Sequence, residues 1–221
     1  MIVITGASDG LGKALAKLYL DAGKKVVGLS RTPCDEGVEY IKTDLHDEQS
    51  IANAATEIIA KKEPLEALIN CAGVLSIEHI EELTTEEIDN VLMTNVRAPL
   101  VLTSRLMRVI KEDGADIVNV ASTVGFKGYL EQAAYGASKW AMRGFSANLQ
   151  AELKNYPSRV ISFCPGGFKT KLFEKATGTD NTTSQGEWMS AEDVARCLKQ
   201  LLDLPKNMEV SEIVINRKQA K

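Results

Sequence analysis

The chain has 221 residues, of which 44% are hydrophobic and 25% are charged, and its formal net charge is -4. This length is sufficient for one large domain, and the composition is typical of a folded globular protein. The negative charge argues against a nucleic acid or an anionic membrane as partner, and no apolar run approaches the length that spans a bilayer.

The four cysteines are widely spaced without a CxxC pair, and only two histidines occur. We therefore expect reduced thiols, a cytoplasmic location and no metal site. The first residues, MIVITG, enter an apolar strand pattern directly, without the basic region and cleavage site of a secretory signal. The sequence predicts a single domain over residues 1–221.

An apolar strand, Ile2–Thr5, leads into the sequence TGASDGLG at Thr5–Gly12, and a helical pattern follows. Gly6 permits a tight turn, Gly10 allows the backbone to approach a phosphate, and Gly12 allows close packing of the helix on the strand. Free N–H groups at the start of the helix attract an anion. Three glycines placed between a strand and a helix predict a nucleotide-binding turn.

The residue after the second strand, Lys25–Ser30, bears on the choice of cofactor. An acid at this point binds the ribose hydroxyls of NAD, whereas a base accommodates the additional phosphate of NADP. Here the residue is Arg31, followed by the hydroxyl of Thr32, which favours NADP(H). The alternative is a surface arginine paired with Asp35 or Glu36.

The third strand, Val38–Lys42, precedes Asp44, which either holds an adenine amino group or caps the helix Glu48–Lys61. The fourth strand, Leu65–Asn70, ends in the sequence NCAG at Asn70–Gly73. Small residues at the end of a strand let a cofactor lie over the sheet, and the alternative is an ordinary turn.

A helical pattern extends from Thr84 to about Lys111 and begins with a capping box, because Glu87 lies three residues after Thr84. Pro99 interrupts this pattern and lacks the N–H that would bond to the carbonyl of Asn95. We expect a bend here and a free Asn95 carbonyl that a water can occupy. The alternative is a bent helix whose freed carbonyl has no role.

The fifth strand, Asp116–Ala121, stops at Ser122, and the next helix contains Tyr135 and Lys139. Residues four apart share a helix face, so Lys139 lies one turn from Tyr135. We expect the cation to lower the pKa of the phenol, which then exchanges a proton with a substrate whose oxygen is held by Ser122. Such a trio needs a redox cofactor for the hydride. A Tyr–Lys pair alone is more often an exposed chance pair.

The sixth strand, Val160–Cys164, is broken by a Pro-Gly-Gly sequence, after which Thr170 either bonds a nicotinamide carboxamide or acts as a cap. The polar residues 171–189 predict either a mobile substrate lid or a disordered loop. The pattern then predicts a helix at Ser190–Leu202, a strand at Ile213–Ile215 and a loose basic tail.

Strands alternate with helices along the whole chain, which predicts an α/β fold, a three-layer, doubly wound parallel sheet of about seven strands. Ligands bind such sheets at the carboxyl ends of the strands. Four of the segments described above fall at such ends: Gly6–Gly12, Asn70–Gly73, Ser122 and Pro165–Thr170.

In combination and spacing, the chain resembles the short-chain dehydrogenase/reductase family. The matching pieces are TGASDGLG, NCAG, Asn95, Ser122, YGASK at Tyr135–Lys139, and PGGFKT at Pro165–Thr170. The resemblance implies a Rossmann-like sheet and a catalytic tetrad. Tyr135 would be the general acid/base, Ser122 the oxygen binder and Lys139 the residue that holds the ribose and lowers the tyrosine pKa. Asn95 would hold a water through its main-chain carbonyl.

The resemblance also implies a set of cofactor contacts and a homodimer or homotetramer formed through the helices at 84–111 and 131–155. Arg31 resembles the NADP-preferring members, although Asp9 stands where some of these carry a base. NADP(H) is the expected cofactor and NAD(H) the alternative. The implied contacts are Gly6, Ser8, Asp9, Gly10, Leu11, Gly12, Ser30, Arg31, Thr32, Asp44, Leu45, Asn70, Ala72, Gly73, Tyr135, Lys139, Pro165, Gly166, Phe168 and Thr170.

The sequence thus predicts an NADP(H)-dependent oxidoreductase that interconverts a carbonyl and an alcohol on a small molecule. One alternative is a non-catalytic protein that senses NADP(H), and another is an enzyme that uses the cofactor for epimerisation or dehydration. Four aromatic residues suggest an apolar wall for the substrate: Phe126, Tyr129, Phe173 and Trp188.

Overall fold

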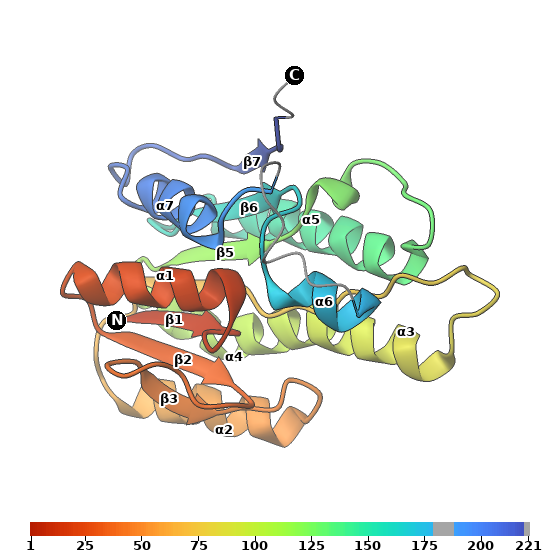
Figure 1. Cartoon of the computed structure of the whole chain (residues 1–221). Helices are drawn as coiled ribbons and strands as arrows, with labels where there is room; N and C mark the ends of the chain where they lie inside the picture. Colours follow the sequence, from red (N-terminus) through yellow and green to blue (C-terminus); the bar gives the residue numbers. More distant parts are fainter. Residues whose placement is uncertain (179–187, 219–221) are drawn as a thin grey trace.

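The computed structural model describes residues 1–178 and 188–218, and a parallel sheet lies at its centre (Figure 1). Seven strands form this sheet in the order β3-β2-β1-β4-β5-β6-β7. They are β1 (Ile2–Thr5), β2 (Val26–Ser30), β3 (Glu39–Lys42), β4 (Ala67–Asn70), β5 (Asp116–Val120), β6 (Val160–Pro165) and β7 (Glu212–Ile215).

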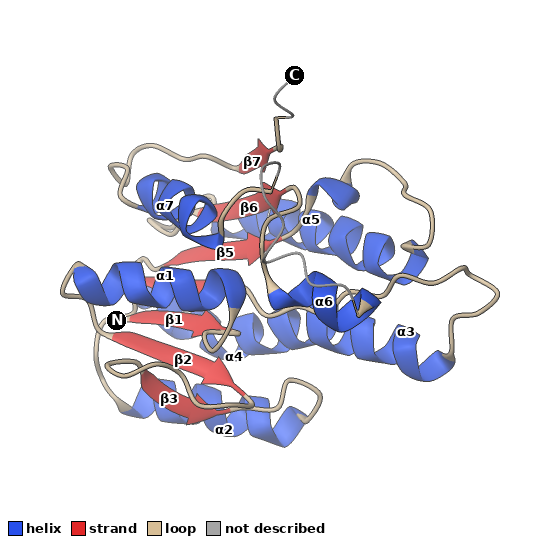
Figure 2. Cartoon of the chain, viewed as in Figure 1, coloured by secondary structure: helices blue, strands red, loops and turns tan. Residues whose placement is uncertain are grey.

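Helices cover both faces of the sheet and complete three layers (Figure 2). The described helices are α1 (Gly10–Asp21), α2 (Glu48–Ala60), α3 (Thr85–Leu92), α4 (Ala98–Asp113), α5 (Ala133–Leu153), α6 (Lys171–Thr177) and α7 (Ala191–Leu202). A π-helical segment, Met93–Arg97, joins α3 to α4, and a 3-10 turn, Thr123–Gly125, follows β5.

Each face of the sheet has its own apolar core. Successive residues of a strand point to opposite faces, so Val3 packs with α2, α4 and α5, whereas Ile2 and Ile4 pack with α1 and α7. Because both faces are covered, the central strands are apolar at nearly every position. This explains why they appear in the sequence as short continuous hydrophobic runs.

The direction of winding reverses between β3 and β4. From β3 at one edge, the chain passes through α2 and returns to the middle of the sheet, where β4 pairs with β1. In open α/β sheets, ligands bind at the carboxyl ends of the strands where the order reverses. The predicted doubly wound parallel fold is confirmed, and its crevice lies between the ends of β1 and β4.

Two features of the helices differ from the sequence prediction. The pattern from Thr84 to Lys111 forms two helices separated by the π segment, and the sequence did not predict helix α6. Residues 179–187 of the predicted lid and residues 219–221 of the basic tail lie outside the described residues.

The amino ends of β5 and β6 are joined by a buried ion pair. Arg159 Nη2 lies 2.7 Å from Asp116 Oδ2, and the two side chains are only 5% and 4% exposed. Arg159 also donates to the carbonyls of Leu202, Leu204 and Met208, which follow or end α7. These contacts join the amino ends of β5 and β6 to the end of α7 and the residues that follow it, at the edge of the sheet opposite the crevice.

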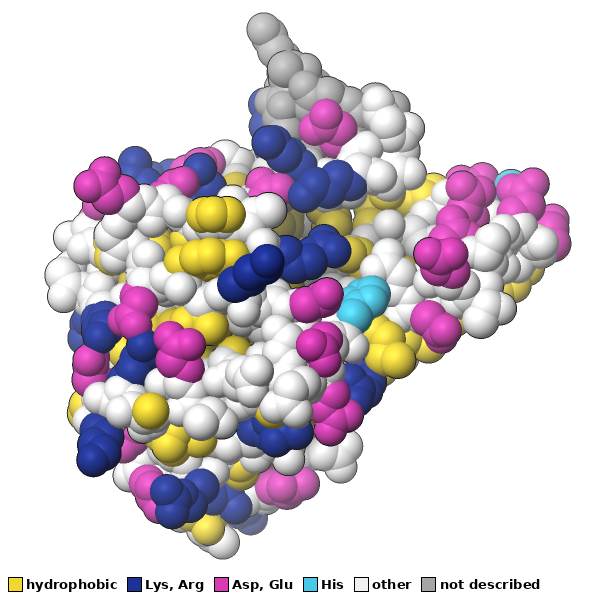
Figure 3. Space-filling view, turned by 90° about the horizontal axis from the view of Figure 1, so that it is seen from below, with side chains coloured by type: hydrophobic (Ala, Val, Ile, Leu, Met, Phe, Trp, Pro, Cys, Tyr) yellow, Lys and Arg dark blue, Asp and Glu magenta, His cyan; other side chains and the backbone are white. Residues whose placement is uncertain are grey.

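The loops that follow β4 and β5 are tied together on the crevice side. The Glu78 N–H donates to the carbonyl of Glu131 over 2.8 Å, and the two loops form a short parallel bridge there. Figure 3 shows acidic side chains gathered on the projecting part of the molecule. The negative charge of the chain is therefore concentrated in part on this projection.

Candidate active site

The predicted site segments meet at the carboxyl edge of the sheet. The Thr5 hydroxyl, at the end of β1, accepts hydrogen bonds of 3.0 Å from the N–H groups of Cys71 and Ala72, which follow β4. These bonds hold the NCAG segment beside the glycine turn. The structure therefore brings together two segments that lie 66 residues apart in the chain.

The turn after β1 requires glycine for identifiable reasons. Gly6 has φ +71°, and a Cβ on it would lie 2.9 Å from the Ala72 Cα. A Cβ on Gly12 would lie 2.4 Å from the Gly6 carbonyl oxygen, so α1 packs directly on the turn. The space left by these missing side chains fits the close approach of a pyrophosphate to the helix N-terminus.

Asp9 serves as the N-cap of α1, because its carboxylate accepts from the Gly10 N–H over 2.8 Å. The same carboxylate forms an exposed ion pair of 3.1 Å with Lys175 of α6. Asp9 was predicted as a cofactor contact, and in the structure its side chain has these two partners within the protein.

The end of β2 presents hydroxyl groups and a free cation. Thr32 donates to the Ser8 hydroxyl over 3.0 Å, and the Ser30 hydroxyl donates to the Thr32 carbonyl over 2.7 Å. Arg31 is exposed, and among residues 1–178 and 188–218 it forms no ion pair; Asp35 instead pairs with Lys13 at 2.9 Å. The predicted alternative, a pair between Arg31 and a neighbouring acid, is therefore wrong for this part of the chain.

The predicted helix-cap role of Asp44 is also wrong, since Asp47 caps α2 by accepting from the Gln49 N–H over 2.9 Å. Asp44 instead accepts from the His46 N–H over 3.0 Å. Leu45, between them, packs against the apolar core beneath the loop. Asp44 thus remains at the sheet edge with a fixed carboxylate.

Helix α5 carries Tyr135 and Lys139 on its buried face, where the two residues are 8% and 5% exposed. The Lys139 Nζ lies 5.5 Å from the centre of the Tyr135 ring and donates to the Val120 carbonyl over 2.9 Å. Ser122, after β5, is also buried and interacts with the Tyr135 hydroxyl. The chance pairing of an exposed Tyr and Lys is excluded.

Close packing of the 3-10 turn on α5 explains how Ser122 reaches Tyr135. The Ser122 hydroxyl caps this turn by accepting from the Val124 N–H over 3.2 Å. A Cβ on Gly125 would lie 2.9 Å from the Arg143 Cδ and 3.0 Å from the Lys139 carbonyl oxygen. Glycine at position 125 therefore lets the turn, and with it Ser122, approach the helix.

The predicted lowering of the tyrosine pKa is wrong, because the net shift is upward and burial causes it. Burial raises the pKa of Tyr135 to about 12, although the interaction with Ser122 opposes this change. Burial also lowers the pKa of Lys139 to about 8. The loss of hydration dominates, and the ammonium points to the Val120 carbonyl rather than at the phenol. The phenol is therefore neutral at pH 7 and ready to donate a proton.

Asn95 lies in the π segment and is 1% exposed. Its side chain accepts from the Val74 N–H over 2.8 Å and donates to the Val74 carbonyl and the Ser138 hydroxyl over 2.9 and 3.0 Å. Ser138 donates in turn to the Tyr135 carbonyl over 2.7 Å. The predicted interruption near Pro99 is present as this π segment, and a free Asn95 carbonyl remains a prediction.

Thr170 lies opposite the glycine turn, since a Cβ on Gly10 would lie 3.2 Å from its methyl group. It caps α6, because its hydroxyl accepts from the Leu172 N–H over 3.3 Å. Nearby, the rings of Phe173 and Trp188 lie 5.8 Å apart, and Trp188 covers Gly167. The aromatic residues at the two ends of the predicted lid thus contact each other.

Sequence reasoning missed several residues that shape this site. Thr5 joins the ends of β1 and β4, Gly125 admits the 3-10 turn, and His46 contacts Thr94. Cys71 lies close enough to Lys139 for the two to affect each other's pKa. Thr5 and Cys71 lie within the TGASDGLG and NCAG sequences, and Gly125 is a glycine soon after a strand end, whereas nothing in the sequence indicated the contact of His46.

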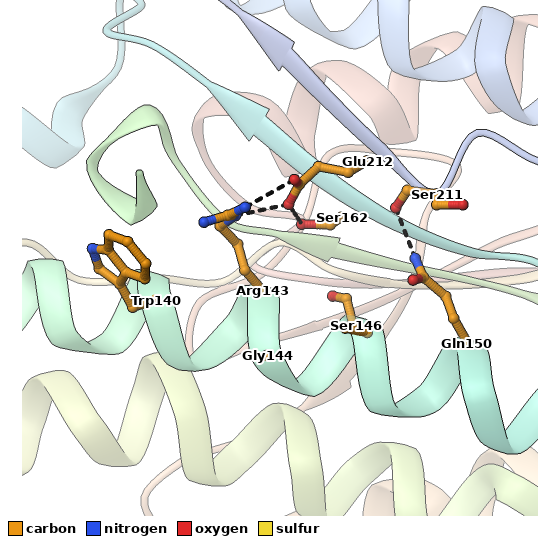
Figure 4. A pocket seen from close by; sticks show the side chains of 9 residues that line it. Trp140, Arg143, Gly144, Ser146, Gln150, Ser162, Ser211 and Glu212 are labelled. Atoms are coloured by element: carbon orange, nitrogen blue, oxygen red, sulfur yellow. Dashed lines mark hydrogen bonds and ion pairs between the residues drawn. The ribbon is translucent and has the colours of Figure 1, made fainter. Parts of the chain in front are cut away.

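A separate cavity of about 360 Å³ lies beside α5 and β7 (Figure 4). In it, Arg143 and Glu212 point toward each other, with Arg143 Nε 2.7 Å from Glu212 Oε1. Trp140, Gly144 and Gln150 complete part of its wall. None of the tetrad residues lines it, so it is distinct from the candidate active site.

The glycine turn that fits a dinucleotide, with a buried and protonated tyrosine beside it, defines a nucleotide-dependent oxidoreductase. A family model described as short chain dehydrogenase matches residues 1–181. The chain belongs to the short-chain dehydrogenase family and is an NAD(P)-dependent dehydrogenase or reductase.

Individual relatives agree with this assignment. The chain is 32% identical over 184 residues to a 3-oxoacyl-[acyl-carrier-protein] reductase of Buchnera aphidicola subsp. Acyrthosiphon pisum, covering 78% of this chain and 75% of that protein. It resembles 4-hydroxyisoleucine dehydrogenase complexed with NADH and succinate, with TM-score 0.86, 28% identity and coverage of 98% and 97%. Serine dehydrogenase complexed with NADP+ has the same fold, with TM-score 0.88, 23% identity and coverage of 97% and 94%.

Among the described residues, every helix is too short or too polar to cross a membrane.

Proposed function

We propose that the protein is an NADP(H)-dependent oxidoreductase that interconverts a carbonyl and an alcohol on a small molecule, with Tyr135 as general acid/base. The observation that carries this proposal is the buried contact of Tyr135 with Ser122 beside Lys139 at the carboxyl end of β5. A Cβ on Gly73 would lie 3.7 Å from the Lys139 Nζ, so the NCAG segment and this group share one site.

In the reducing direction, the Ser122 hydroxyl holds the carbonyl oxygen of the substrate. A reduced nicotinamide held at this site would supply the hydride. Tyr135 donates its proton to the oxygen, because a pKa of about 12 keeps the phenol protonated at neutral pH. The product is an alcohol, and Tyr135 regains its proton from solvent. The reverse reaction requires the phenolate as base.

Lys139 and Asn95 support this step from α5 and the π segment. The Lys139 ammonium, with a pKa of about 8, is mostly charged at neutral pH. We propose that it holds the ribose hydroxyls of the nicotinamide half. The Asn95 side chain is fully used in bonds to Val74 and Ser138. Its proposed contribution is therefore its main-chain carbonyl, as the holder of a water.

The unpaired Arg31 supports a preference for NADP(H). Among the described residues its guanidinium forms no ion pair, and we propose that it binds the 2'-phosphate. Thr32, the next residue in the chain, donates to the Ser8 hydroxyl over 3.0 Å. The solved relatives described above were complexed with NADP+ in one case and NADH in the other, so both cofactors occur on this fold. NAD(H) is the alternative cofactor for this chain.

We further propose a homodimer or homotetramer associated through α4 and α5, in a reducing, cytoplasmic compartment. Trp140 on α5 is 51% exposed and Leu100 on α4 is 38% exposed, which leaves apolar surface available to a second copy. The four cysteines are free thiols. Sedimentation of the native chain and of Trp140→Glu tests the assembly, and a native monomer would refute it.

The function is tested by incubating the protein with NADPH and a panel of aldehydes and ketones, and by measuring the loss of nicotinamide absorbance. We expect turnover with a subset of the panel. The variant Tyr135→Phe should bind NADPH as tightly as the native protein and lose turnover by a factor of about 10² or more. Full activity of this variant would refute the proposed role of Tyr135.

The same experiment separates the alternatives. A protein that only senses NADP(H) would bind the cofactor and leave every carbonyl unchanged. An epimerase or dehydratase would convert a substrate without net consumption of NADPH. The presence of Ser122, Tyr135 and Lys139 in one buried cluster favours the oxidoreductase, because a sensor has no need of them.

A further inference from the structure

A single histidine connects two parts of the site. His46 lies in the loop between β3 and α2, and its Nε2 shares a hydrogen bond of 2.8 Å with the hydroxyl of Thr94, 48 residues away in the chain. Thr94 is 8% exposed and directly precedes Asn95 in the π segment. The nucleotide side of the sheet edge therefore contacts the segment that carries Asn95.

The backbone of the same histidine fixes the residue that was predicted to hold adenine. The His46 N–H donates to Asp44 Oδ1 over 3.0 Å, and the Asp44 N–H donates to the Ser50 hydroxyl over 2.9 Å. His46 thus binds Asp44 through its main chain and Thr94 through its side chain. A displacement of Asp44 is expected to move the imidazole as well.

The π segment has an irregular backbone and is held from outside the helix by the contact with His46. In it, the Ala98 N–H bonds to the Met93 carbonyl five residues earlier, a rare geometry that often marks functional positions. A threonine hydroxyl inside a helix commonly bonds to a carbonyl of the preceding turn. In this structure the hydroxyl of Thr94 instead has His46 as a partner outside the helix. Arg97, at the end of the segment, forms a second bond across the same boundary, 2.5 Å long, to Glu48.

Beyond the π segment, the contacts continue to the catalytic tyrosine. The Asn95 amide donates to the Ser138 hydroxyl over 3.0 Å, and Ser138 donates to the Tyr135 carbonyl over 2.7 Å. Hydrogen bonds and adjacent residues therefore connect Asp44 to Tyr135 without a gap. Coupling between two sites is carried by contiguous networks of hydrogen bonds and packed side chains, and this set supplies such a network.

We propose that His46 is a positioning residue that couples occupancy of the adenine end of the site to the placement of Asn95 and Tyr135. This inference rests on the proposed function, since it assigns Asp44 to the adenine end and Tyr135 to the chemistry. His46 itself contacts neither the substrate nor the reacting atoms; its effect passes through Thr94.

The test compares His46→Ala, Thr94→Val and the double variant with the conservative variants His46→Gln and Thr94→Ser. Thr56→Val is the matched control, because the Thr56 hydroxyl bonds only to the Ala52 carbonyl within α2. His46 is exposed apart from this contact, so its substitution should leave the fold intact, and thermal unfolding checks this.

We expect kcat at saturating NADPH to fall about tenfold in His46→Ala and in Thr94→Val, with a smaller change in the KM for the carbonyl substrate. The double variant should be no worse than the worse single variant, because both remove the same contact. His46→Gln and Thr94→Ser should recover most of the activity. Additive effects, or native kcat in His46→Ala, would overturn the inference.

A second measurement does not depend on turnover. Adenosine 2',5'-bisphosphate, which resembles only the adenine end of NADP, is added while the side-chain amide of Asn95 is observed by NMR. We expect its resonance to shift in the native protein and in Thr56→Val, and to stay in place in Thr94→Val. An equal shift in Thr94→Val would contradict the coupling.

The two measurements also separate this inference from the proposed function. If Tyr135→Phe loses turnover while His46→Ala keeps it, the function stands and the coupling is refuted. If the native protein reduces no carbonyl, the function is refuted, and the NMR titration still decides whether His46 connects the adenine end to Asn95.

Discussion

At the scale of single residues, the proposed chemistry depends on the protonation state of one buried phenol. Tyr135 is 8% exposed, and the loss of hydration raises its pKa to about 12 in spite of the Ser122 hydroxyl. The neutral phenol is the form that donates a proton to a carbonyl oxygen, whereas the phenolate is the form that removes one from an alcohol. Near neutral pH the phenol is therefore in the form that the proposed reduction requires.

The pH dependence of the two directions should differ accordingly. The phenolate fraction increases as the pH rises toward 12, so the rate of alcohol oxidation should increase from neutral pH to about pH 10, the ordinary pKa of a tyrosine. The rates are measured at saturating cofactor, because Lys139, with a pKa of about 8, loses its charge over the same range. The rate of carbonyl reduction should not increase over this range. Initial rates in both directions in a series of buffers provide the measurement. An oxidation rate that is maximal at neutral pH would contradict the effect assigned to burial.

Arg31 provides a second prediction at this scale. Its replacement in Arg31→Asp puts a carboxylate where the 2'-phosphate is expected, so the ratio of kcat/KM for NADPH to that for NADH should fall by a factor of about 10 or more. Arg108→Asp is the matched control, because Arg108 is an exposed residue of α4 with an 80% exposed side chain. An unchanged ratio in Arg31→Asp would remove this residue from cofactor selection.

At the scale of elements, the site depends on how closely the 3-10 turn packs on α5. The turn carries Ser122 at its start and has glycine at position 125, where a side chain would meet Arg143 and the Lys139 carbonyl. The distance between Ser122 and Tyr135 is therefore set by a residue that takes no part in the reaction.

Gly125→Ala should displace this turn by a few tenths of an ångström and lower kcat about tenfold, because small misplacements of catalytic groups are costly. The Kd for NADPH should remain near its native value. Gly128→Ala is a close control, since a Cβ at that position would have open space around it. Native kcat in Gly125→Ala would show that the turn tolerates the added methyl group.

Most elements were predictable because their signals are local. Seven apolar runs indicated the parallel sheet, because helical patterns separate all of them except the second and third, which a loop joins. The capping box at Thr84 and the cap at Ser190 located two helix starts. The π segment was not predictable in form, because the insertion of one residue into a helical turn leaves the apolar pattern nearly unchanged. Helix α6 has seven residues, none of them buried, so it has no apolar face to recognise.

The grouping of Ser122 with Tyr135 and Lys139 was predicted, whereas the direction of the tyrosine pKa was not. Spacing along a helix reveals that a lysine lies one turn from a tyrosine, but it does not reveal how much water the fold removes from both. The His46–Thr94 contact was equally hidden, because it joins residues 48 positions apart, one in the loop before α2 and the other in the π segment.

At the scale of the whole molecule, stability and chemistry are located at opposite ends of the sheet. The buried pair of Arg159 and Asp116 closes the amino ends of β5 and β6, while the predicted catalytic groups lie at the carboxyl edge. Lys206 adds a second cation to Asp116 at 2.7 Å. Loss of one partner of such a pair leaves a charge in a poorly hydrated place.

Arg159→Met should therefore lower the free energy of unfolding by about 3–5 kcal/mol, as measured by denaturant titration. The folded fraction should keep native kcat and KM, because the change lies far from the crevice. Arg108→Met, which removes an exposed pair with Glu112 on α4, should change the free energy of unfolding by less than about 1 kcal/mol. Equal effects of the two substitutions would show that the buried pair has no special importance.

The reversal of winding between β3 and β4 has a consequence for how such enzymes diversify. The predicted contacts to the adenosine half come from the chain before Lys62, while the four predicted catalytic residues come after it. Grafting the first third of one homologue onto the remainder of another would transfer dinucleotide choice and leave the acid–base groups of the recipient intact. In such a graft, His46 and Glu48 would come from the donor, while their partners Thr94 and Arg97 would come from the recipient. The graft therefore requires that the residues at these four positions still form the two contacts.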